Sequence, residues 1–161
     1  KNHDLIPILD ESIKLTSEFD KSIKIDLNKS NVKILFNCDR EQLSRVFFNL
    51  IKNSVESIIQ KSEKEGFFDK KISIEILDNN DHIKFILVDN GIGFDQIKNN
   101  IKVLTNPYFT TKKNGTGLGL SIVNKIINDH NGELLFLPIS NGAKVEINFR
   151  LDGNRNLNSW R

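Results

Sequence analysis

Apolar side chains recur every three or four positions in three stretches of the chain, and this spacing predicts three amphipathic helices. The first covers residues 5–19 and the second covers residues 43–59. The third follows a group of glycines at 115–119 and stops at His130. A weaker pattern at 96–104 predicts one further short helix.

The ends and buried face of the second and third helices can be assigned residue by residue. Asp39 is placed to cap the second helix, with Gln42 as its reciprocal partner. Gly132 is expected to be the left-handed cap that ends the third helix. The buried stripe of the second helix is expected to contain Leu43, Val46 or Phe47, Leu50 and Ile58.

Alternation of apolar and polar residues predicts six strands. They lie at 23–27, 32–36, 72–76, 83–88, 134–137 and 145–151. The strand at 83–88 becomes apolar on both faces toward its end, which is typical of a central strand. The last two strands are joined around Asn141-Gly142, a strong hairpin signal. Residues 61–70 are predicted to be a loop, and residues 152–161 a tail without regular structure.

Composition narrows the class of protein without identifying it. The 161 residues suffice for one domain with its own core. No apolar run approaches the roughly 18 residues that a membrane span needs, and a net charge of +2 gives no nucleic-acid or membrane-surface signature. The single Cys38 excludes an intrachain disulfide and fits a reducing compartment. Because the chain contains no methionine and begins with Lys1, we expect it to be part of a longer protein.

The stretch Asp89-Asn90-Gly91-Ile92-Gly93-Phe94 places a carboxylate and two glycines directly after a predicted strand. A carboxylate at a strand end can accept a hydrogen bond from an exocyclic amine such as that of adenine. Gly91 and Gly93 allow a ligand to approach the backbone closely. Taken alone, the pattern also fits an ordinary turn.

Asn49 and Asn53 lie one turn apart in the second predicted helix. Asparagine is a poor interior helix residue, so the pair asks for a reason. Amide oxygens are suitable ligands for Mg²⁺, which takes phosphate oxygens and water for its other positions. A solvated polar face is the alternative interpretation.

Gly115, Gly117 and Gly119 lead into the third predicted helix. Bare backbone amides at the positive end of a helix are suited to bind an anion. No Lys-Ser or Lys-Thr pair follows the last glycine, so the pattern is not a P-loop. The alternative is that the glycines only permit tight packing.

In their order along the chain, these stretches resemble the sequence boxes of the ATP-binding catalytic domain of sensor histidine kinases, which has the Bergerat (GHKL) fold. The asparagine box corresponds to 49–53, the first glycine box to 89–94, the phenylalanine box to 107–112 and the second glycine box to 115–120. The resemblance implies a catalytic domain at 1–151 and a tail at 152–161. It also implies an α+β fold, a two-layer α/β sandwich in which a mixed sheet of about five strands carries three helices on one face.

The resemblance assigns roles to individual residues. Asn53 matches the family's magnesium ligand, Asn49 its companion near the metal and phosphates, and both are expected to be catalytic. Asp89 matches the carboxylate that reads adenine, and Lys112 or Lys113 is expected to offer charge to the γ-phosphate. With ATP and Mg²⁺ as cofactors, the expected ATP-binding set is Asn49, Lys52, Asn53, Asp89, Gly91, Gly93, Phe109, Thr110, Thr111, Lys112, Gly115, Thr116, Gly117, Leu118 and Gly119.

One departure from the family pattern changes the expected electrostatics. Many members carry a lysine three residues beyond the metal asparagine, whereas this chain has Glu56. The stretch 53–57 resembles the nitrogen-regulation (NtrB/NtrY-like) branch, in which an acid at this position is usual. Positive charge for the triphosphate is then expected from Lys52, Lys112 or Lys113.

The identity of residue 49 indicates the type of reaction. Related ATPases on this fold place a glutamate four residues before the metal asparagine, where it can polarise water or a hydroxyl; here the residue is Asn49. An amide cannot accept a proton at neutral pH, whereas a neutral imidazole is already a nucleophile. The expected reaction is therefore transfer of the γ-phosphate to a histidine, with residues 105–114 closing over the nucleotide.

None of the three histidines, His3, His82 and His130, lies in the sequence setting of a family acceptor. The acceptor is therefore expected on a dimerisation domain that precedes Lys1 in the parent protein. The expected partners are that domain and a response regulator, without nucleic-acid or membrane contact by this domain, in the cytoplasm whether or not the parent is a membrane-bound sensor. The alternatives are an ATP-binding regulatory module without transfer activity, or an ATPase on the same fold.

Overall fold

The computed structural model describes residues 1–94, 101–112 and 115–151, and its centre is a five-stranded sheet. The strands lie in the order β2 (Lys24–Lys29), β4 (Lys71–Asp78), β5 (His82–Asp89), β7 (Gly142–Arg150) and β6 (Gly132–Ile139). Only β2 and β4 run parallel, so the sheet is mixed. β5 is the middle strand, as its sequence predicts.

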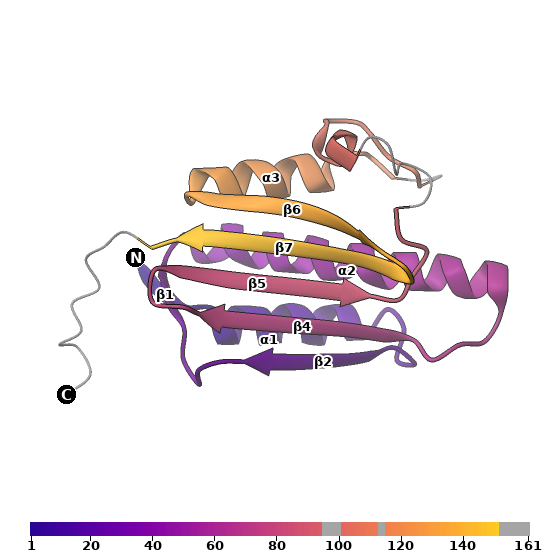
Figure 1. Ribbon diagram of the computed structural model, residues 1–161, viewed down its shortest axis with the longest axis horizontal. Coiled ribbons are helices and arrows are strands. Elements are labelled where there is room, and N and C mark those ends of the chain that lie inside the picture. Colours follow the sequence, from indigo (N-terminus) through magenta and orange to yellow (C-terminus); the bar gives the residue numbers. More distant parts are fainter. Residues whose placement is uncertain (95–100, 113–114, 152–161) are drawn as a thin grey trace.

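Three helices lie on one face of this sheet (Figure 1). They are α1 (Leu5–Ser17), α2 (Arg40–Glu65) and α3 (Gly119–Asp129), and a 3-10 helix, η2 (Ile101–Thr105), lies in the segment before α3. The predicted two-layer α/β sandwich is confirmed. η2 covers the C-terminal part of the short helix predicted at 96–104, and residues 96–100 lie outside the described residues. The predicted tail at 152–161 also lies outside them.

Helix α2 begins where the sequence predicts and ends later. The Asp39 carboxylate accepts a hydrogen bond from the Gln42 backbone N–H at 3.0 Å, which caps the helix. The prediction of a loop from residue 61 is wrong for residues 61–65, because α2 continues to Glu65 and ends before Gly66. Lys61 and Glu65, four residues apart, form an ion pair that favours this last turn.

The core lies between the sheet and the helices. The inward positions of β5 are Ile83, Phe85, Leu87 and Asp89, and each is buried. Phe85 packs against Phe47 of α2 with ring centroids 5.1 Å apart. The other predicted members of the α2 stripe, Leu43, Val46, Leu50 and Ile58, are also buried. Because alternate side chains of β5 point to the same face, the last of them, Asp89, points into the helix layer.

The predicted strand at 32–36 is shorter and pairs differently from its neighbour at 23–27. β3 (Leu35–Asn37) pairs antiparallel with β1 (Asn2–Asp4) in a separate two-stranded sheet. Val32 is exposed outside any strand. The Asp4 carboxylate accepts hydrogen bonds from the Ile6 and Ile34 backbone N–H groups. It therefore caps α1 and also holds the residue just before β3 in place.

The prediction that Gly132 is the left-handed cap of α3 is wrong. Asn131 adopts the left-handed conformation, with φ of 56°, while Gly132 begins β6. A Cβ atom at Gly132 would lie 2.8 Å from both Ile127 Cγ2 and Phe149 Cδ1. The glycine is therefore required by close packing between α3 and β7, a constraint that the local sequence does not reveal.

Candidate functional site

Asp89 is a buried carboxylate at the end of the central strand, with only 4% of its surface exposed. Its Oδ2 accepts a hydrogen bond from Ser54 Oγ at 2.8 Å, and its Oδ1 accepts one from the Gly91 backbone N–H at 2.9 Å. Ser54 comes from α2, so the carboxylate is held from both layers of the fold. Sequence reasoning missed Ser54, although a serine inside the apolar stripe of a helix is a usable signal.

Burial raises the pKa of Asp89 above its ordinary value, because a charge is removed from water. The hydrogen bonds from Gly91 and Ser54 act in the opposite direction. Such a carboxylate gains from any further hydrogen-bond donor that reaches it. The site therefore suits a ligand that presents an amine.

Replacing Ser54 with alanine should destabilise the fold by about 1.5–3 kcal/mol, because the hydroxyl donates to a buried charged group. The change should also raise the Asp89 pKa further, since this hydrogen bond lowers it. Urea unfolding at neutral pH measures the first effect. Ser62→Ala is the matched control, because Ser62 Oγ donates only to the Ile59 carbonyl of its own helix at 3.0 Å. Equal costs for the two variants would contradict the importance of the Ser54 contact.

The two glycines after Asp89 are required by close contacts. A Cβ atom at Gly91 would lie 2.2 Å from Ser57 Oγ on α2, and one at Gly93 would lie 2.5 Å from the Gly142 carbonyl oxygen. Ser57 Oγ also accepts a hydrogen bond from the Ile92 backbone N–H at 3.0 Å. These contacts hold the turn close to α2.

Asn90 and Lys61 fix this turn from outside. The Asn90 side chain accepts from the Lys71 backbone N–H at 2.9 Å and donates to the Asp69 carbonyl at 2.6 Å. Lys61 Nζ donates to the Asn90 carbonyl at 3.2 Å and to Asn141 Oδ1 at 2.7 Å. The end of α2, the turn and the β6–β7 hairpin are thereby joined. Neither residue was singled out from the sequence.

Asn49 and Asn53 lie on the part of α2 that faces the start of α3 and the segment before it. Asn49 Nδ2 donates to the Arg45 carbonyl at 2.9 Å, and its Oδ1 lies 3.7 Å from the position of a Cβ at Gly119. Asn53 Oδ1 accepts a hydrogen bond from Lys112 Nζ at 2.9 Å. The structure therefore brings both asparagines near predicted glycine-box and phenylalanine-box residues.

Glu56, the acid that stands where many family members carry a lysine, pairs with two lysines. Lys112 Nζ contacts Glu56 Oε2, and Lys52 Nζ lies 3.7 Å from Glu56 Oε1. Two of the three lysines expected to supply positive charge thus pair with this one carboxylate. Lys113 lies outside the described residues.

Described residues on the two sides of positions 113–114, between η2 and α3, contact one another. The Lys112 backbone N–H donates to Thr110 Oγ1 at 3.0 Å, and a Cβ at Gly115 would lie 2.4 Å from that same oxygen. A Cβ at Gly117 would lie 2.2 Å from the Tyr108 carbonyl carbon. The remaining predicted residues of this segment are half-buried Phe109 and Leu118 and exposed Thr111 and Thr116.

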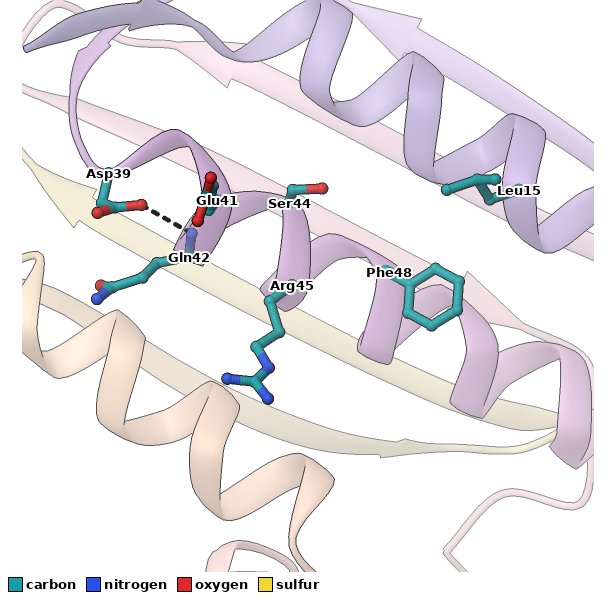
Figure 2. A pocket seen from close by; sticks show the side chains of 7 residues that line it. All are labelled: Leu15, Asp39, Glu41, Gln42, Ser44, Arg45 and Phe48. Atoms are coloured by element: carbon teal, nitrogen blue, oxygen red, sulfur yellow. Dashed lines mark hydrogen bonds between the residues drawn. The ribbon is translucent and has the colours of Figure 1, made fainter.

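A hollow on the outer side of the helices does not belong to this site. Figure 2 shows it between α1 and the first half of α2, with Leu15 and Phe48 on one side and Arg45 on the other. Its remaining lining residues are Asp39, Glu41, Gln42 and Ser44. None of the predicted site residues lines it.

The three histidines lie on other parts of the fold. His82 begins β5 and Asp89 ends it, about 23 Å away at strand spacing. His3 pairs with Phe36 in the two-stranded sheet, and His130 ends α3, with its ring 6.2 Å from that of Phe36. The His130 ring is fully engaged, because Nδ1 donates to the Ile126 carbonyl at 2.7 Å and Nε2 accepts from the Asp39 backbone N–H at 3.1 Å.

Among residues 1–94, 101–112 and 115–151, no group of three or more His, Cys, Asp or Glu side chains is arranged to hold a metal ion. A divalent cation at Asn53 would then need other oxygens, such as those of phosphates and water. Within the same ranges, every helix is too short or too polar to cross a bilayer.

Comparison with known sequences gives a family and a set of relatives. Residues 38–153 match the family model described as histidine kinase-, DNA gyrase B- and HSP90-like ATPase. Sporulation kinase E of Bacillus subtilis is 40% identical over 98 residues, which is 61% of this chain and 12% of the relative. A putative NtrY-like sensor histidine kinase of Rickettsia bellii is 31% identical over 155 residues, which is 94% of this chain and 24% of the relative. The chain spans a quarter or less of these relatives.

Solved structures share the fold. The catalytic domain of histidine kinase ThkA, in a nucleotide-free form, superposes with a TM-score of 0.78 at 26% identity, covering 93% of this chain and 94% of that one. ThkA in complex with the response regulator protein TrrA gives a TM-score of 0.73 at 24% identity, covering 96% of this chain and 42% of that one.

Proposed function

Because the chain belongs to the family of histidine kinase-, DNA gyrase B- and HSP90-like ATPases, we propose that it binds ATP with Mg²⁺ and transfers the γ-phosphate to a histidine of a separate acceptor domain. The observation that carries this proposal is the pairing of buried Asp89 with Ser54 at one end of the site and the cation contact of Asn53 at the other. The names of the relatives support two-component signalling as the setting.

Each part of the site has a role in this proposal. The Asp89 carboxylate accepts a hydrogen bond from the adenine amine, and Gly91 and Gly93 leave room for the base. Asn53 holds Mg²⁺, which neutralises charge on the transferring phosphates. The fit of Asn53 to a cation is supported by the Lys112 ammonium against its Oδ1.

Transfer to histidine is favoured over hydrolysis by Asn49 and by the positions of the histidines. The Asn49 amide already donates to the Arg45 carbonyl and cannot accept a proton from water. The position of His82 at the other end of β5 from Asp89 supports an acceptor on another domain. We expect that domain to be the dimerisation domain of the parent, with a response regulator as the next partner, in the cytoplasm where ATP is available.

The test is to mix this domain with Mg-ATP labelled on the γ-phosphate and with the acceptor helices of the parent protein. We expect label on the acceptor, stable to base and labile to acid as a phosphohistidine is, and none on an acceptor whose histidine is replaced by glutamine. Nucleotide binding without labelling would indicate a regulatory module. Release of free phosphate without any acceptor would indicate an ATPase.

A further inference from the structure

One ammonium group lies between two oxygen ligands of helix α2. Lys112 Nζ donates to Asn53 Oδ1 at 2.9 Å and contacts Glu56 Oε2. The two α2 residues are three apart, so their side chains lie on the same face. A single cation therefore reaches an amide oxygen and a carboxylate oxygen together.

This pair of oxygens is what a hard divalent cation selects. Mg²⁺ binds carboxylate and amide oxygens, keeps several waters and takes phosphate oxygens of a nucleotide. The Lys112 ammonium is a cation that occupies the same place, and its contacts with these oxygens are weaker and less directional than those of a bound Mg²⁺. Since like charges repel strongly at such short range, Lys112 and Mg²⁺ cannot both contact Asn53 Oδ1.

We propose that Asn53 and Glu56 together form the divalent-cation position, and that the Lys112 ammonium holds this position until Mg²⁺ displaces it. The proposal rests on the proposed function for the role of Asn53, and adds Glu56 as a metal-site residue and Lys112 as the occupant of that position before the metal binds. Once displaced, Lys112 is free to contact the triphosphate.

A negative charge at Glu56 would be expected to repel a nearby triphosphate, and the proposal explains how this repulsion is avoided. Glu56 pairs with Lys112, and its Oε1 lies 3.7 Å from Lys52 Nζ, so its charge is balanced. With Mg²⁺ bound, the metal balances the same charge. The carboxylate therefore never faces the phosphates unpaired, which would otherwise oppose binding.

The first experiment removes the occupant. Lys112→Met should lower the Mg²⁺ concentration needed for half-maximal ADP binding, by about tenfold if the Lys112 contact is populated in nine of ten molecules. ADP serves as the probe because it has no γ-phosphate for Lys112 to bind. Lys125→Met is the matched control, since it removes an exposed ion pair of 2.7 Å with Asp129 on α3. An unchanged Mg²⁺ requirement in Lys112→Met would overturn the role of Lys112.

The second experiment tests Glu56 as part of the metal position. It uses the Lys112→Met background, where Glu56→Gln no longer releases Lys112; among the described residues, the Lys52 contact at 3.7 Å is the one ion pair it still removes. Adding Glu56→Gln there should raise the Mg²⁺ requirement of ADP binding about tenfold, the scale of losses at metal sites. No change, or a lower requirement, would show that Glu56 only holds Lys112 and would overturn its metal role.

These outcomes are separable from failure of the proposed function. If the unaltered domain binds no ADP or ATP at any Mg²⁺ concentration, the nucleotide site itself is wrong. If it binds with a clear Mg²⁺ dependence and the variants leave that dependence unchanged, only the present inference fails. Lys112 and Glu56 side chains are both more than a third exposed, so the variants should fold, and thermal unfolding checks this.

Discussion

Replacing Asp89 with asparagine should weaken binding of Mg-ATP about 100-fold while leaving the domain folded. A hydrogen bond to a charged group contributes about 1.5–3 kcal/mol, which corresponds to roughly 10- to 150-fold in affinity. The asparagine can also turn its amide donor toward the adenine amine, which adds repulsion. Calorimetric titration of Mg-ATP into both proteins measures the change, and equal affinities would contradict the adenine role of Asp89.

The stability of the Asp89→Asn variant is the control for that experiment. Burial raises the pKa of Asp89, so the folded state binds this proton more tightly than the unfolded state does. The free energy of unfolding of the unaltered protein should therefore rise as pH falls through the folded-state pKa of Asp89. Above that pKa, the buried charge of Asp89 lowers the free energy of unfolding. The neutral asparagine removes this dependence. Thermal unfolding against pH should show a flatter profile for the variant.

The same linkage predicts how binding depends on pH. The ionised carboxylate is the acceptor for the adenine amine, so affinity for Mg-ATP should fall as pH is lowered through the raised pKa of Asp89. The Asp89→Asn variant should lack this loss.

Replacing Gly142 with alanine should destabilise the fold by about 4 kcal/mol or more, at the high end for a single substitution. A Cβ at Gly142 would lie 1.8 Å from the Asp89 carbonyl oxygen, and φ at this position is +117°. The backbone that carries Asp89 would have to move, so Mg-ATP binding should weaken as well. Urea unfolding measures the stability and calorimetry the affinity.

Gly66→Ala separates steric overlap from backbone strain. Gly66 also has a positive φ, of +80°, but nothing lies within 4 Å of an added Cβ. Its replacement should cost only about 1–3 kcal/mol, because a φ of 80° with a ψ of −147° is a backbone conformation that residues with a Cβ rarely adopt. Similar costs at both positions would show that the contact with Asp89 is relaxed easily.

The sequence predicted the elements whose signals are local and repeated. The helices α1 to α3 and strands β4 to β7 follow from periodicity, because each has one face on a single core. Pairing across the chain was not predictable in this way. β1 has three residues and exists because Leu35–Asn37 supplies its partner, and the last turn of α2 is stabilised by an ion pair in a stretch rich in charge.

Candidate site residues could be selected from the sequence where the residue type indicates a chemistry, and not where long-range contacts decide. Asp89 was selected because an acid followed by two glycines comes directly after a predicted strand, and Asn49 and Asn53 because stacked amides are unusual in a helix. Ser54 and Lys61 are common residue types whose importance lies in partners 35 and 29 positions away along the chain. The contact of Lys112 with Asn53 likewise joins segments 59 positions apart.

Placing the acceptor histidine on a separate domain has a kinetic consequence for the proposed reaction. The rate of transfer then depends on the effective concentration of acceptor at the site. A short flexible connection supplies concentrations on the order of millimolar, well above what free acceptor reaches in a dilute mixture. A sensor would then control phosphorylation by changing how often the two domains meet, with no alteration of the ATP site itself.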